Sequence, residues 1–331
     1  MMNPFSRGLV FALTVAGIVC QSHASGLLLV ANKGEHTMGI IDPEAGKQIA
    51  TIQEDGITGH ELVASPDGKR AFVPIYGNSG VGHPGTDGSI MRVIDVASRQ
   101  VVATVDFGKG VRPHCAVIGP KNGLLYITTE LDNCITVIDP ESLKIIGHIP
   151  TGSAESHMLA ITRDGAHGYT ANVGPGTVSV LDMASKTLLG IIPVCKTTQR
   201  IAISPDDKWV FTADQDKPRL AAISTANNKV DHWIDLPGVA YGTAPTPDGH
   251  WLIVTIPRAS KMAIVDLNTM KVASTIDVPK APQEVVVRPD GGEAYVSCDA
   301  SRQVAVLDTG NWTVKKLIDA GKGVDGLAWA Q

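Results

Sequence analysis

The segment HMLAITRDGAHGYTANVGPGTVSVLDMASKTLLGII, residues 157–192, contains four short runs in which apolar and polar residues alternate. The runs are HMLAIT, GYTANV, TVSVLD and TLLGII, and residues that favour turns separate them. Alternation with a period of two is typical of β-strands that bury one face. The segment therefore predicts four consecutive strands joined by tight turns.

The pattern recurs along most of the chain with a constant spacing. The turn blocks are SPDGKRAF at Ser65, GPKNGLLY at Gly119, TRDGAHGY at Thr162, SPDDKWVF at Ser204, TPDGHWLI at Thr246 and RPDGGEAY at Arg288. From Pro120 through Arg163, Pro205, Pro247 and Pro289 the steps are 43, 42, 42 and 42 residues, whereas the first step, from Pro66 to Pro120, is 54. Four strands in a period of about 42 residues indicate a propeller blade.

The two ends of the chain complement each other. The first copy, GLLLVANKGEHTMGIIDPEAGKQIATI at residues 26–52, has the second, third and fourth strands but no first. The final GVDGLAWAQ, residues 323–331, matches a first strand and then stops. A C-terminal strand that completes the N-terminal blade would close the ring and remove its open edges. We predict an all-β, seven-bladed β-propeller of four-stranded blades, closed in this way.

The N-terminus has the features of a secretory signal peptide. A lone Arg7 precedes an apolar run, and small residues lie at Ser22 and Ala24. We predict that residues 1–24 are cleaved and that residues 25–331 form one propeller domain. A lipoprotein anchor at Cys20 is disfavoured, because Val19 stands where such signals need a small residue. The expected location is therefore periplasmic or secreted.

Composition narrows the range of partners. No later segment has the run of about 18 apolar residues that a membrane span requires. Loss of residues 1–24 removes Arg7 and no acidic residue, so the formal net charge changes from -5 to -6. This charge gives no electrostatic reason to expect nucleic acid. We expect a small-molecule ligand, and a monomer is the simplest oligomeric state.

The repeat blocks resemble those of a known family. YITTELDNCITVID, YTANVGPGTVSVLD and YVSCDASRQVAVLD are similar to the blades of the YVTN-repeat β-propellers of exported bacterial proteins. The resemblance covers nearly all of the chain after the signal peptide and implies the propeller fold. It says little about function, because propellers of this kind include lactonases, haem-binding domains, quinoprotein subunits, nucleic-acid binders and surface-layer proteins.

Three histidines occupy the same position in consecutive repeats. His60, His114 and His157 each stand six residues before the repeat anchor, where the later repeats have Gln199, Tyr241 and Gln283. Strand connectivity places all of these positions on one rim of the channel. A repeated polar residue can tie neighbouring blades together, and three histidines can also converge on one metal ion. Because the histidines stop after three blades, we favour a divalent metal site, with zinc or copper as candidates.

Other polar residues are predicted on the same rim. They are Glu61, Glu130, Glu155, Arg200, Tyr241, Glu284, Asp299 and Asp325, with His36 and, in the Tyr76–Ile90 insertion, His83. Arg200, Tyr241 and His83 are candidates for contact with a ligand, and Glu130 and Glu284 for a general base. The insertion can fold over the channel mouth as a lid or form a simple surface loop.

These residues give two functional hypotheses. The first is a metal-dependent, lactonase-like hydrolase of a small lactone or ester, with the metal at His60, His114 and His157. The second is a non-catalytic propeller that binds a ligand, a cofactor or a partner. The four later cysteines, Cys115, Cys134, Cys195 and Cys298, allow three disulfide pairings, among which the sequence does not choose. One of these thiols could join a site for copper or zinc, but buried free thiols are our preferred interpretation.

Overall fold

The computed structural model describes Met1 and residues 26–331. The predicted signal peptide and its cleavage site lie outside the described residues, apart from Met1. The described part of the chain forms 28 strands and three short 3-10 helices. None of its helices has the length and apolar character needed to cross a membrane. The strands build seven four-stranded antiparallel sheets, which confirms the predicted fold class.

The first four blades follow one another around the ring. Blade 1 consists of β28 (Val324–Ala330), β1 (Leu27–Asn32), β2 (Thr37–Asp42) and β3 (Lys47–Gln53). Blade 2 consists of β4 (Val63–Ala64), β5 (Arg70–Gly77), β6 (Asp87–Asp95) and β7 (Gln100–Asp106). Blade 3 consists of β8 (Pro113–Ile118), β9 (Leu125–Thr129), β10 (Cys134–Ile138) and β11 (Ile145–Pro150). Blade 4 consists of β12 (Ser156–Ile161), β13 (His167–Asn172), β14 (Thr177–Asp182) and β15 (Thr187–Pro193).

Three further blades complete the circle. Blade 5 consists of β16 (Ile201–Ile203), β17 (Trp209–Ala213), β18 (Arg219–Ser224) and β19 (Lys229–Asp235). Blade 6 consists of β20 (Thr243–Pro245), β21 (Trp251–Ile256), β22 (Lys261–Asp266) and β23 (Lys271–Asp277). Blade 7 consists of β24 (Pro282–Val287), β25 (Glu293–Cys298), β26 (Gln303–Asp308) and β27 (Thr313–Asp319). The 3-10 helices η1 (Glu130–Asp132), η2 (Pro257–Ala259) and η3 (Asp299–Ser301) join second to third strands.

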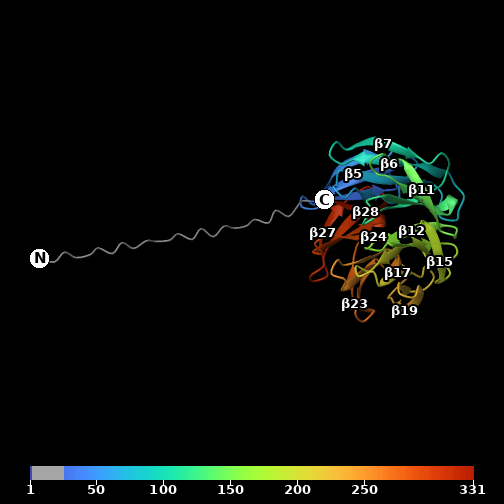
Figure 1. Cartoon of the computed structure of the whole chain (residues 1–331). Coiled ribbons are helices and arrows are strands. Elements are labelled where there is room, and N and C mark those ends of the chain that lie inside the picture. The colour runs from blue at the N-terminus through green and yellow to red at the C-terminus, as the bar shows by residue number, and fades with distance from the viewer. Residues whose placement is uncertain (2–25) are drawn as a thin grey trace.

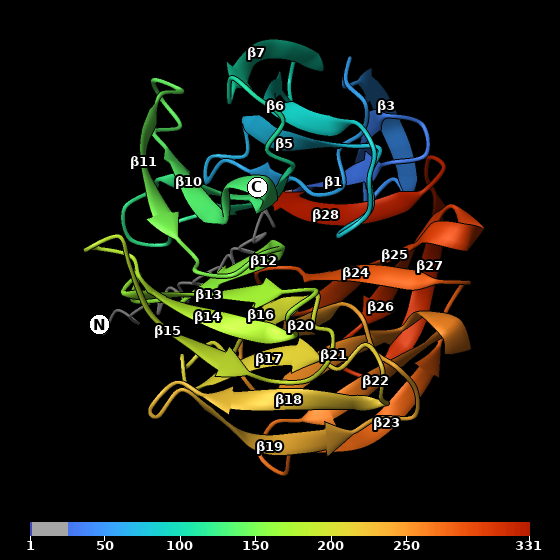
Figure 2. The same ribbon diagram turned by 90° about the vertical axis from the view of Figure 1, so that its right-hand side faces the viewer.

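The C-terminal strand closes the ring, as the sequence predicts. Strand β28 pairs antiparallel with β1, and Ala328 lies opposite Leu29. Figure 2 shows the red β28 beside the blue β1, and Figure 1 shows the colours running once around the molecule. The innermost strand of blade 1 is therefore supplied by the last residues of the chain. Closure leaves no inner edge of blade 1 open to pair with another chain.

The core lies between successive blades. The residue six after each repeat anchor sits in the second strand, and Tyr126, Tyr169, Phe211 and Tyr295 at this position are buried between neighbouring blades. The fourth strands expose most of their residues but bury one near their end, such as Ile192 in β15. This division explains the alternating pattern, because only one face of each outer strand meets the next blade.

The repeated aspartate at the end of the third strand, which only blade 5 replaces with a serine, Ser224, has a local structural role. In blade 4, Oδ1 of Asp182 accepts hydrogen bonds from the backbone N–H groups of Ala184 at 3.0 Å and Ser185 at 2.8 Å. Equivalent bonds to Asp139, Asp266 and Asp308 close the same turn in other blades. The aspartates thus stabilise the turns to the outer strands, and they do not belong to the site.

Ring closure should depend on the apolar side chains of β28. Leu327 is 5% exposed, whereas Leu317 on β27 is 47% exposed. We expect Leu327→Ala to lower the free energy of unfolding by about 2 to 4 kcal/mol and Leu317→Ala to change it by less than about 0.5 kcal/mol. Chemical unfolding followed by circular dichroism measures both. Equal effects of the two substitutions would show that packing of β28 does not hold the ring together.

Candidate functional site at the channel mouth

Strand register places one residue of each blade at an equivalent point on the rim. In blade 1 Ala328 pairs with Leu29, just as Val117 pairs with Tyr126 in blade 3. Asp325 lies three residues before Ala328, and His114 lies three residues before Val117, so the two are counterparts. The sequence repeat predicts six of these positions. It does not mark the seventh, Asp325, because the last strand lacks the turn that follows the first strand in the other repeats. Starting from blade 1, the seven residues are Asp325, His60, His114, His157, Gln199, Tyr241 and Gln283.

The three predicted histidines do come together. The rings of His60 and His114 meet edge to face with centroids 5.6 Å apart, and those of His114 and His157 stack at 3.6 Å. The ring centroid of Tyr76, the first residue of the predicted insertion, lies 4.9 Å from that of His60 and 5.2 Å from that of His114. His114 and His157 are buried, whereas His60 is partly exposed. The cluster therefore faces the mouth through His60.

A buried carboxylate orients the third histidine. Glu130, which begins η1 in blade 3, forms an ion pair and a short hydrogen bond with Nδ1 of His157 in blade 4. The other oxygen of Glu130 accepts a 2.8 Å hydrogen bond from the hydroxyl group of Tyr76. Both carboxylate oxygens of Glu130 are thus engaged, which differs from the free carboxylate expected of a general base. The arrangement leaves Nε2 of His157 as the ring nitrogen not held by Glu130.

The local environment keeps two of the histidines uncharged. Burial lowers the pKa of His60 to about 4, although the carboxylate of Asp325 opposes this effect. Burial also holds the pKa of His114 well below its ordinary value, and the neighbouring imidazoles of His157 and His60 act in the same direction. Nδ1 of His114 is buried without a hydrogen-bond partner among the described residues. Neutral imidazoles with an unused nitrogen are able to bind a metal ion or a hydrogen-bonding ligand.

The cluster is not arranged as a finished metal site. Two imidazoles on one tetrahedral zinc ion have ring centroids about 5 Å apart, given a Zn–N distance of about 2.0 Å. The separation between His60 and His114 is close to this value, but the stacked pair of His114 and His157 is too close. Accordingly, the described residues contain no group of three His, Cys, Asp or Glu side chains positioned to hold a metal.

Threonine hydroxyl groups link the inner strands of adjacent blades near the mouth. In blade 3, Thr128 accepts a hydrogen bond from the backbone N–H of Cys115 and donates one of 2.9 Å to the carbonyl oxygen of His157 in blade 4. Thr255 makes the same pair of contacts with Gly242 and with Gln283 of blade 7. Because Thr255 does this between blades without a rim histidine, a tie between blades does not require the imidazole.

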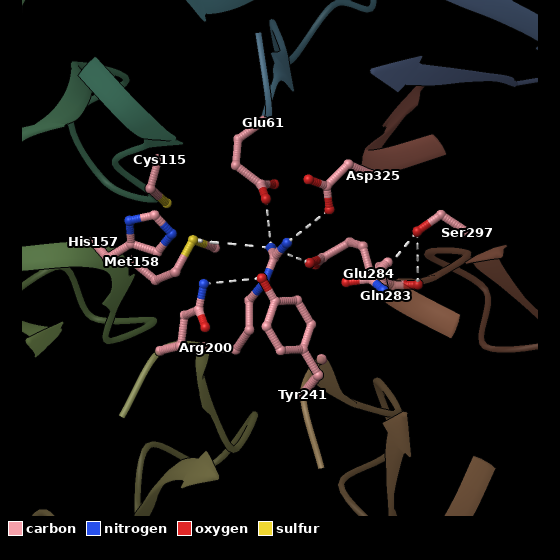
Figure 3. Close-up of polar contacts among 12 residues, drawn as sticks. Glu61, Cys115, His157, Met158, Arg200, Tyr241, Gln283, Glu284, Ser297 and Asp325 are labelled. Atoms are coloured by element: carbon pink, nitrogen blue, oxygen red, sulfur yellow. Dashed lines mark hydrogen bonds and ion pairs between the residues drawn. The ribbon is translucent and has the colours of Figure 1, made fainter. Parts of the chain in front are cut away.

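A layer of side chains with one member from every blade crosses the channel; we call it the septum. Its members are Asp325, Glu61, Cys115, Met158, Arg200, Tyr241 and Glu284. Arg200 lies at its centre, as Figure 3 shows, and is 3% exposed. Its Nη1 lies 2.5 Å from Oε1 of Glu61 and forms a second ion pair with Glu284, and its Nη2 lies 3.1 Å from Asp325.

Arg200 and Tyr241 are the residues predicted to contact a ligand. In the structure they contact each other within the septum. The Tyr241 ring lies 4.9 Å from the guanidinium carbon of Arg200, and Gln199 donates a 3.0 Å hydrogen bond to the Tyr241 hydroxyl. Burial raises the pKa of Glu61 well above its ordinary value and also raises that of Glu284, against the opposing effect of Arg200. Glu284, the second candidate base, is thus committed to Arg200.

The insertion forms the wall of a cavity beside the histidine cluster. Its loop, residues 78–86, is held by Arg112, whose guanidinium donates to the carbonyl oxygens of Gly80 and His83 and to Asp87. Exposed His83 lines this cavity of about 390 Å³ together with Glu130 and Arg112. The structure therefore brings His83 and Glu130 to the same cavity. The loop is shorter than the predicted Tyr76–Ile90 insertion, because β5 continues to Gly77 and β6 begins at Asp87.

Several rim residues lie apart from the histidines. Glu155 accepts a 2.7 Å hydrogen bond from the backbone N–H of Gly174, and Asp299 lies 3.6 Å from Nζ of Lys33. Lys33 also forms a 3.1 Å ion pair with Asp325 and was not predicted by the sequence analysis. The sequence signal that could have identified Lys33 is its position just after the second strand of blade 1. Among the described residues Cys115, Cys134, Cys195 and Cys298 are free thiols, and all of them except the partly exposed Cys195 are buried, as predicted.

A second unpredicted residue, Glu54, supports the segment that carries His60. Its side chain is fully buried, and Oε2 accepts a 2.9 Å hydrogen bond from the backbone N–H of Gly59. Oε1 has no hydrogen-bond partner within the described part of the chain. Burial raises the pKa of Glu54 to about 7. Nothing in the repeat pattern marks this residue, because Glu54 lies in an interblade connection.

Comparison with known proteins supports the fold. No family model matches the chain, and no curated protein does, so the resemblance to YVTN-repeat propellers remains a prediction. Among solved structures, the hydrazine synthase of Kuenenia stuttgartiensis has a TM-score of 0.71 at 19% identity, over 86% of this chain and 92% of that chain. A functionally unknown protein of Desulfotomaculum acetoxidans has a TM-score of 0.77 at 13% identity, over 93% and 99%. At these identities the similarity establishes the propeller fold alone.

The buried carboxyl group of Glu54 should make stability depend on pH. Its pKa is about 7 in the folded protein and 4.5 ordinarily, so the folded state binds this proton more tightly. Its stabilising contribution is complete below pH 4.5 and is lost as the pH rises through about 7. We expect Glu54→Gln, which cannot ionise, to gain about 3 kcal/mol in unfolding free energy over the wild type between these limits.

Urea unfolding at a series of pH values measures this difference. Glu35→Gln, on the exposed turn between β1 and β2, is the matched control and should follow the wild type. Parallel pH profiles for Glu54→Gln and the wild type would contradict the assignment.

Proposed function

We propose that this protein is a metal-binding propeller whose histidine cluster holds one divalent ion, zinc or copper, at the channel mouth. The observation that carries the proposal is the anchoring of His157 by Glu130, itself fixed by Tyr76. Histidines that bind metals usually donate their second ring N–H to a carboxylate, which fixes the ring and raises its basicity. His60 and His114 would provide the other nitrogens, since both are neutral at ordinary pH.

Binding requires a small rearrangement within the cluster. The stacked rings of His114 and His157 would have to part so that their in-plane nitrogens converge, while His60 and His114 already have a suitable separation. Nδ1 of His114, buried and without a partner among the described residues, would gain one if the ring turns. Partly exposed His60 provides access from the solvent.

The finer proposal is hydrolysis of a small lactone or ester at this site. A bound ion would polarise a carbonyl group or lower the pKa of a water molecule. Glu130 would act as a positioning residue for His157 because both of its oxygens are occupied. His83 would contact the ligand from the adjacent cavity, and export by the predicted signal peptide would bring this activity to the periplasm or outside the cell.

A second candidate is a non-catalytic propeller that binds or carries a ligand. It is favoured by the engagement of both candidate bases, Glu130 with His157 and Tyr76, and Glu284 with Arg200. Turnover of p-nitrophenyl acetate and of a simple lactone by the metal-loaded protein separates the candidates. Stoichiometric metal without turnover supports the carrier, whereas turnover that His114→Ala abolishes supports the hydrolase.

Metal binding can be tested before any substrate is known. We expect purified protein exposed to zinc or copper and then dialysed to retain about one ion per chain and to melt at a higher temperature than the metal-free form. His114→Ala should lose the ion and the thermal shift. His250→Ala, at an exposed histidine on the opposite face, should keep both. Elemental analysis and thermal unfolding provide the readouts, and a wild type with neither ion nor shift would refute the proposal.

The role of Glu130 has its own test. We expect Glu130→Gln to bind the ion about 10 to 100 times more weakly, because the amide no longer supports His157 as a carboxylate does. Glu155→Gln changes another carboxylate of the same rim that contacts a backbone N–H and no histidine, and should leave the affinity unchanged. Competition with a chromogenic chelator measures both. Equal affinities in the two variants would remove the argument from Glu130.

A further inference from the structure

The septum divides the channel into two compartments. The histidine cluster lies on the rim side, and the inner strands continue from the septum towards the turns on the opposite face. Directly below the septum these strands line an open cavity of about 330 Å³. Most of the residues that line it are apolar, Val63, Leu159 and Leu327 among them, and polar atoms, including those of Glu61 and Glu284 at the septum, share its surface.

The cavity is large enough for a small organic molecule. An apolar cavity of about 150 Å³ in another protein holds benzene, and this one has roughly twice that volume. A second cavity, also of about 330 Å³, lies further along the same inner strands beside Val117, Ile161 and Ile203. It reaches the turns at Pro120 and Pro205, which mark the opposite face.

Charges around the septum do not balance. Two cations, Arg200 and Lys33, face three buried carboxylates, Glu61, Glu284 and Asp325, and Lys33 also contacts the more exposed Asp299. The three carboxylate side chains are at most 17% exposed, so water compensates them poorly. Glu61 is 6% exposed, and its Oε1 shares Nη1 of Arg200 with Glu284. The layer is thus short of one positive charge at the roof of the cavity.

A ligand that carries its own positive charge would compensate for this excess of buried negative charge. An anionic ligand would add to the excess of negative charge, and a neutral one would leave it unchanged.

We propose that the lower channel is a second binding site, which takes a small primary ammonium compound with an apolar body. The ammonium group would lie against Glu61 and Glu284, and the body would fill the apolar cavity beneath. This site is separate from the proposed metal site, because Arg200 and its carboxylate partners lie between the two.

Isothermal titration calorimetry with benzylammonium tests the proposal, with benzyl alcohol as its neutral analogue. We expect benzylammonium to bind about tenfold or more tightly than benzyl alcohol, because only the ammonium group forms charge-assisted hydrogen bonds with the roof. Equal affinities, or no binding of either compound at millimolar concentration, would overturn the proposal. Binding should persist in chelator-treated protein, so failure of the metal proposal leaves this outcome unaffected.

Two kinds of variant locate the site. Glu61→Gln leaves two cations facing two carboxylates and should abolish the preference for benzylammonium. Glu284→Gln makes the same change of charge in blade 7. It is the alternative variant if Glu61→Gln does not fold. Val63→Phe fills part of the cavity without changing its charge. It should weaken the binding of both compounds to the same extent. Retention of the preference in a folded Glu61→Gln or Glu284→Gln variant would contradict the assignment of the ammonium site.

Discussion

The pairing of β28 with β1 is the constraint on which the rest of the structure depends. It joins residues separated by almost the whole length of the chain and turns seven similar sheets into a closed ring. Only a closed ring directs one position of every blade towards a common axis. The rim residues and the septum are therefore products of closure, since no single blade contributes more than a few of their members.

Equivalent backbone positions do not imply equivalent energies. Around the rim the same position holds an aspartate, three histidines, two glutamines and a tyrosine. Below it, Arg200 is buried at a point where it can reach carboxylates from three other blades. A buried guanidinium group without such partners would be strongly destabilising, so the burial of Arg200 depends on its carboxylate partners. The repeat provides the scaffold, and departures from the repeat provide the chemistry.

The fold and the location of the site follow from sequence pattern, whereas the contacts within the site do not. Period and alternation predict the blades, the closing strand and the convergence of His60, His114 and His157, because strand connectivity alone decides which ends share a face. Sequence could not reveal that His114 stacks on His157 or that Glu130 is shared with Tyr76. Those contacts depend on side-chain rotamers across blade boundaries. Asp325 was recognised as a rim residue but not as the counterpart of the histidines, because the closing strand lacks the turn that marks the other repeats.

Closure by the last strand also has a consequence for the order of folding. Strand β1 lies near the beginning of the described chain, and its partner β28 ends one residue before the terminal Gln331. Blades 2 to 7 consist of consecutive strands and can form locally as they emerge, but blade 1 cannot be completed until the whole chain is present. Such distant pairing slows folding, since the entropy of closing a long loop is lost before the contacts form. For a chain that begins with a predicted export signal, this delay would keep the ring open until the whole polypeptide is available.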